Sequence, residues 1–116
     1  MTKSFDFNAL TQQTLETKLG GPDNIIIHVT APPERLVEQL ASALDEIQEL
    51  SKAQGHEVEA VRASYDLAAK LISCNSEGLQ ITADDLREKF DIYPAALAAY
   101  LAAYMDFIND FHNAKN

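Results

Sequence analysis

The stretch Tyr93-Pro-Ala-Ala-Leu-Ala-Ala-Tyr-Leu-Ala-Ala-Tyr-Met-Asp-Phe-Ile-Asn-Asp-Phe111 decides how the rest of this chain packs. Wound at about 3.6 residues per turn, it is predicted to be a helix with one broad apolar arc. Pro94 suits the first helical position, where its missing N–H is not needed, so we expect the helix to begin there. The arc is too wide for a single partner helix and consists of Tyr93, Leu97, Tyr100, Leu101, Tyr104, Phe107, Ile108 and Phe111.

Two interpretations of this arc stay open. Apolar stripes at helical spacing usually fill a core, so the arc can pack against the other helices and the hairpin. Tyrosine-rich amphipathic surface also suits contacts with a partner or a second copy of the chain, because it is apolar and yet tolerates water. In that second interpretation the partner-binding residues are Leu97, Tyr100, Leu101, Tyr104, Phe107, Ile108 and Phe111.

Upstream of this helix, apolar periodicity predicts two long helices, at about 33–54 and 57–75, with Gly55 as the stop between them. Thr82-Ala-Asp-Asp85 has the pattern of a capping box with Asp in place of the usual Glu, and predicts a short helix that ends near residue 91. The helical part is therefore expected to span residues 33–112.

Two β-prone runs precede the helices. A Gly, Pro, Asp and Asn cluster separates them, so residues 14–30 are predicted to form a β-hairpin. Residues 1–13 carry Phe5, Phe7 and Leu10 among polar residues and are expected to form a short strand or an arm. We found no repeat or linker, so the predicted fold class is α+β, mainly α: one domain, 1–116, with an N-terminal hairpin followed by about four helices.

Composition narrows the classes of function. The chain has 116 residues, a formal net charge of −9 and a pI near 4.6. This charge disfavours nucleic acids and anionic membrane surfaces as partners, because both bind cationic proteins. The longest apolar run has the length of a buried helix, and the first residues lack the apolar core of a signal peptide, so we expect a cytoplasmic protein.

Residues suited to catalysis or metal binding are scattered. His28, His56, His112 and Cys74 lie in different predicted elements and form no ligand-spaced pair, and Cys74 is expected to act as a small apolar residue on a helix. The carboxylates between Glu34 and Glu49 are expected to form a solvated helix face, and Asp84 with Asp85 a helix start. We therefore expect no enzyme, no metal and no cofactor.

The order of features resembles the tail assembly chaperones of long-tailed phages and prophages. The residues that carry the resemblance are Phe5-Asp6-Phe7, the hairpin ending in Val29-Thr30-Ala31-Pro32-Pro33, the Leu36–Leu50 helix, Leu71-Ile72-Ser73-Cys74-Asn75, Thr82-Ala-Asp-Asp-Leu86 and Ala99-Tyr-Leu-Ala-Ala-Tyr-Met-Asp-Phe-Ile108. The resemblance implies a non-enzymatic chaperone in the bacterial host cytoplasm. Such a chaperone binds the apolar, helical tape measure protein and aids assembly of the tail tube, with the tail tube protein as a further partner.

Two other classes of function remain open. One is a different phage morphogenesis adaptor, which binds a single folded partner. The other is an acidic regulator that occupies a basic protein, which needs carboxylates spaced like phosphates. Self-association through the apolar arc is compatible with each of them.

Overall fold

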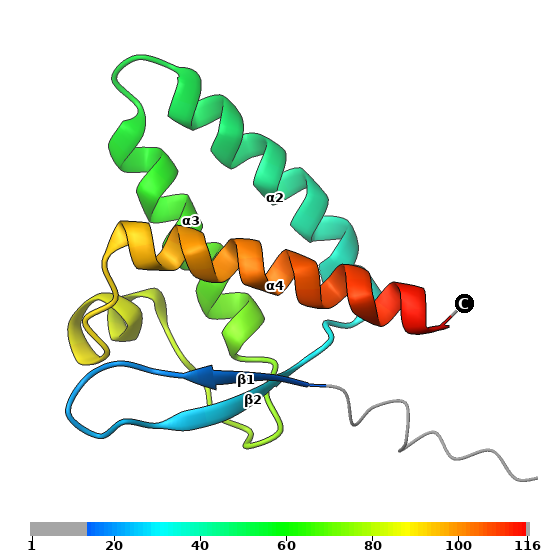
Figure 1. Cartoon of the computed structure of the whole chain (residues 1–116). Helices are drawn as coiled ribbons and strands as arrows, with labels where there is room; N and C mark the ends of the chain where they lie inside the picture. Colours follow the sequence, from blue (N-terminus) through cyan, green and yellow to red (C-terminus); the bar gives the residue numbers. More distant parts are fainter. Residues whose placement is uncertain (1–13, 116) are drawn as a thin grey trace, which may run out of the picture.

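The structure is a computed structural model that describes residues 14–115, with side chains described for residues 14–110. The predicted arm or short strand at 1–13 lies outside the described residues. The described part consists of a two-stranded hairpin followed by four helices (Figure 1). This arrangement confirms the predicted α+β fold with its N-terminal hairpin.

The hairpin pairs β1 (Thr14–Lys18) with β2 (Ile26–Thr30) in antiparallel register, from Thr14 opposite Thr30 to Lys18 opposite Ile26. The side chains alternate between two faces, as the strand period requires. Thr17, Ile27 and Val29 are buried on the inner face, whereas Glu16 and Lys18 are exposed on the outer face. Gly21, in the connection, has a φ of +88°, a conformation that glycine adopts without strain.

Helices α2 (Glu34–Lys52) and α3 (Glu57–Ile72) form a helical hairpin that extends away from the strands (Figure 1). Pro33 lies just outside α2, with an extended backbone, so the helix begins one residue later than its expected start at Pro33. Gly55 lies in the connection with a φ of +89°, as expected of the residue that stops a helix.

Helix α3 ends before its predicted end at Asn75, because polar side chains form hydrogen bonds with backbone groups there. The Ser73 hydroxyl accepts a hydrogen bond from the Ile81 N–H at 3.0 Å, and the Asn75 amide donates to Ile72 O at 2.8 Å. Such local bonds compete with the helical ladder. Cys74 therefore lies just beyond the helix rather than on it, half-buried, and burial raises the pKa of its thiol.

The predicted short helix is one turn, η1 (Asp85–Lys89), in which the Phe90 N–H donates to Asp85 O at 2.9 Å, five residues back. The predicted capping box is confirmed. The Asp85 N–H donates to Thr82 Oγ1 at 3.0 Å, and the Thr82 N–H donates to Asp85 Oδ2 at 3.1 Å. These reciprocal bonds fix the start of the turn.

Helix α4 (Pro94–Lys115) begins at Pro94 as predicted and continues past residue 112, the predicted end of the helical part. It crosses α3 and passes over the hairpin (Figure 1). The core lies where the inner face of the hairpin, the second half of α3, η1 and α4 meet, and its most buried large side chains are Ile27, Val29, Leu71, Ile72, Leu86, Leu97 and Tyr104.

Candidate partner-binding surface

The structure divides the seven residues predicted to bind a partner into three groups. Leu97, Tyr104 and Ile108 are buried in the core, with exposed fractions of 2%, 0% and 5%. Three others, Tyr100, Leu101 and Phe107, are partly exposed and pack against that core. The side chain of the seventh, Phe111, lies outside the described ones. The binding role of the seven stays a prediction. Among the six whose side chains are described, only the partly exposed ones are accessible in the folded chain.

The two central tyrosines of α4 face the hairpin and the core. The Tyr100 hydroxyl lies 3.0 Å from Thr17 Oγ1 on β1, which ties α4 to the inner face of the sheet. The Tyr104 hydroxyl has no hydrogen-bond partner among the described residues, and burial raises its pKa. Much of the tyrosine-rich arc thus belongs to the core, as the first interpretation of the arc states.

An apolar groove lies on another side of α4. It has a volume of about 320 Å³ and is formed by the end of α2, the first half of α3 and the start of α4. Leu97 forms part of its floor, and Leu101 and Ala98 belong to its α4 side. The remaining lining residues are Ile47, Ser51, Ala60, Val61, Ser64, Tyr65 and Pro94.

The hydroxyl groups that line this groove are already satisfied. Ser51 donates to Gln48 O at 2.8 Å, and Ser64 donates to Ala60 O at 2.9 Å, each within its own helix. Tyr65 donates to Ile92 O at 2.6 Å. Because these side-chain groups have partners within the chain, the groove offers a ligand mainly apolar contact.

A second, more open hollow of about 510 Å³ adjoins the groove. Val61 lines both, so the apolar surface is continuous from one to the other. Val58 and Val61 are 71% and 38% exposed, which is high for aliphatic side chains. Arg62 and Arg87 also line the hollow, and the Arg87 guanidinium lies 4.7 Å from the centroid of the Tyr65 ring.

The alanine side of α4 is exposed. The exposed residues on this side are Ala95, Ala98, Ala99, Ala102 and Ala103. The predicted solvated acidic face of α2 is confirmed, since Glu34, Glu38, Asp45, Glu46 and Glu49 are all exposed. Apolar groove and acidic surface thus lie on one small domain.

Sequence reasoning found part of this surface and missed the rest. Leu97 and Leu101 were among the expected partner-binding residues, and both line the groove. The contributions of α2 and α3, such as Ile47 and Val61, were missed because partner contacts were expected only on the last helix. The available signal was the number of apolar stripes: three long amphipathic helices present more apolar surface than 116 residues can cover.

The described residues contain no group of three or more side chains suited to hold a metal ion. His28 and His56 pair with glutamates on the surface, at 2.7 Å from Glu77 and 3.0 Å from Glu59. Within the described range, no helix combines the length and the apolar character needed to cross a membrane. No protein-family model, curated protein or solved structure matches this chain.

Proposed function

We propose that this protein is a non-enzymatic tail assembly chaperone of a long-tailed phage or prophage, which holds apolar helices of the tape measure protein until the tail assembles. The observation that supports the proposal best is the apolar groove between α2, α3 and α4, with its hydroxyl groups satisfied inside the chain. The family resemblance supplies the identity of the client.

The size of the groove suits part of one helix. A cavity of about 150 Å³ holds one benzene ring, so about 320 Å³ takes about two apolar side chains. Val58 and Val61, in the adjoining hollow, add contact for a third. Helix-in-groove recognition uses such anchors at positions i, i+3 and i+4 or i+7 of an amphipathic helix.

The acidic exposed face of α2 supports a holding role. A chaperone that covers an apolar client must keep the complex soluble, and net charge far from zero does this. The exposed carboxylates of α2 do not line the groove, so a bound helix leaves them in water.

The first test is co-expression with the large, helix-rich protein encoded just downstream in the source genome. The expected result is that this protein becomes soluble and co-purifies at moderate salt. If it stays insoluble and nothing co-purifies, the proposal is wrong.

The second test locates the binding surface. Val61→Asp with Ala98→Asp places two carboxylates in the groove at positions exposed in the free chain, so folding is preserved and client binding is expected to be lost. The matched control, Ala41→Asp with Ala102→Asp, adds the same charge at exposed positions outside the groove and should still bind. Equal client binding by both double variants would exclude the groove as the binding surface.

A further inference from the structure

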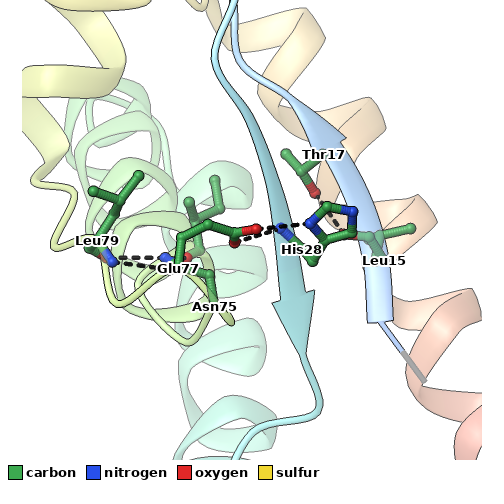
Figure 2. Close-up of polar contacts among 7 residues, drawn as sticks. Leu15, Thr17, His28, Asn75, Glu77 and Leu79 are labelled. Atoms are coloured by element: carbon green, nitrogen blue, oxygen red, sulfur yellow. Dashed lines mark hydrogen bonds and ion pairs between the residues drawn. The ribbon is translucent and has the colours of Figure 1, made fainter. Parts of the chain in front are cut away.

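The two outer edges of the hairpin differ in what pairs with their backbone groups. The outer edge of β2 is covered by the segment after α3: Thr30 N–H donates to Cys74 O at 2.8 Å, and Ser76 N–H donates to His28 O at 2.9 Å. The Glu77 carboxylate accepts a bond from the His28 N–H at 2.8 Å. Figure 2 shows Glu77 and the Asn75–Leu79 turn on the β2 side of the hairpin.

The outer edge of β1 is paired with no other described segment. Leu19 N–H donates to Ile25 O at 2.8 Å, so in this antiparallel register the groups of Leu15 and Thr17 face β2, while those of Thr14, Glu16 and Lys18 face outward. The outward-facing groups of β2 belong to His28 and Thr30, which oppose Glu16 and Thr14 and confirm this alternation. Among the described residues, nothing bonds to the outward backbone groups of Glu16 and Lys18.

Helix α4 contacts the inner face of the sheet through Tyr100 and Thr17, and Glu16 and Lys18 on β1 are exposed. The side chains of Glu16 and Lys18 point to the exposed outer face, and neither forms an ion pair with another described residue. A strand edge of this kind is a template for pairing with another strand.

We infer that β1 is a dimerisation edge, where β1 of a second copy of this chain adds in antiparallel orientation and the two hairpins form one four-stranded sheet. Charge selects the register. Pairing centred on Thr17 places Glu16 of each copy opposite Lys18 of the other, and both residues have outward-facing backbone groups that exchange hydrogen bonds. Centring the pair on Glu16 or on Lys18 instead places like charges opposite each other.

The same register also suits the inner face. It places Leu15, which is half-buried in one copy, opposite Leu19 of the other copy, so apolar surface on both chains is covered further. This dimer does not depend on the proposed chaperone function, and it leaves the groove between α2, α3 and α4 unused.

The experiment measures the dimer dissociation constant of the full chain by sedimentation equilibrium for four proteins: wild type, Glu16→Lys, Lys18→Glu and the double reversal. Each single reversal turns two attractive cross-strand pairs into two repulsive ones and should weaken the dimer about tenfold or more. The single reversals move the net charge in opposite directions, so a general charge effect cannot weaken both. The double reversal restores opposite charges at the same net charge and should regain wild-type affinity.

A second readout locates the contact. In wild type, amide hydrogen exchange at Glu16 and Lys18 should slow as the protein concentration rises, because dimer formation bonds these N–H groups. The inference is overturned if the wild-type chain stays monomeric up to millimolar concentration. It is equally overturned if a dimer forms whose dissociation constant is indifferent to both single reversals.

Discussion

Helices α2 and α3 look alike in sequence, each with an apolar stripe and a polar face, but they are buried very differently. Of the 16 residues of α3, seven are buried, whereas of the 19 residues of α2 only Leu40 is. The second half of α3 is covered by the hairpin, η1 and α4, while the α2 stripe is covered mainly by α3 (Figure 1). Amphipathicity thus predicts a helix but not how fully its stripe is covered, and the incompletely covered stripes leave the groove.

Matched leucine-to-alanine variants in α3 and α2 should show the largest difference in the free energy of unfolding. Leu71→Ala, at a fully buried position of α3, is expected to lower the free energy of unfolding by about 2–5 kcal/mol. Leu44→Ala, at a half-buried position of α2, should cost less than about half as much, because less apolar area returns to water. Urea denaturation measures both. Equal losses would mean that α2 is as well packed as α3.

Two glycines sharpen the same contrast, because they share a backbone conformation but differ in surroundings. An added Cβ at Gly21 would lie 2.5 Å from Lys89 O, whereas one at Gly55 would meet nothing within 4 Å. With φ of +88° and +89°, both alanine variants carry the left-handed strain, about 1 kcal/mol. Gly21→Ala should lose about 1–2 kcal/mol more in the free energy of unfolding, since backbone must move. Thermal unfolding measures both losses. Equal losses of unfolding free energy would indicate that the backbone at Lys89 shifts at little cost.

The helix starts offer a smaller test. Thr82→Ala removes the hydroxyl that accepts from the Asp85 N–H in the capping box and should lower the free energy of unfolding by about 1 kcal/mol. The start of α3 has no side-chain cap, so His56→Ala should change stability by less. Thermal unfolding of both variants measures the difference, and an equal effect would show that the box contributes little.

The smallest expected effect is the pH dependence of the segment that covers β2. The hydrogen bond with Glu77 raises the pKa of His28 above 6.5, and the same bond lowers the pKa of Glu77 below 4.5. A raised histidine pKa contributes stability below 6.5 that is lost as pH rises through the folded pKa. A lowered glutamate pKa contributes stability above 4.5 that is lost as pH falls through the folded pKa.

The contact between His28 and Glu77 should therefore protect this segment best between about pH 4.5 and pH 6.5, and the protection should fall as pH rises through the folded pKa of His28. Hydrogen exchange at the Ser76 amide, which bonds to His28 O, reports the protection. Glu77→Gln is the control and should exchange faster than wild type within this window and equally outside it. A constant difference at every pH would assign the effect to packing.

Local signals predicted most of the fold. Turn residues placed the hairpin, Gly55 separated α2 from α3, Thr82 and Asp85 formed the expected capping box, and Pro94 began α4. The predicted end of α3 was wrong, because the side chains of Ser73 and Asn75 form hydrogen bonds with backbone groups of Ile72, Leu79 and Ile81. The candidate site was predicted only at Leu97 and Leu101, because periodicity identifies an apolar stripe without saying what lies against it.

By itself, the sequence determined which segments are helices and strands, where most of them begin, and that apolar helix surface is in excess. These properties depend on neighbours within a few residues, through capping, turn conformation and side-chain period. The tertiary structure alone decided that Tyr104 is core, that Val61 is exposed beside a groove, and that described segments cover the edge of β2 but not that of β1. These properties depend on which elements, distant in the sequence, pack against each other. An apolar stripe or a strand edge has the same sequence pattern whether it is covered or open.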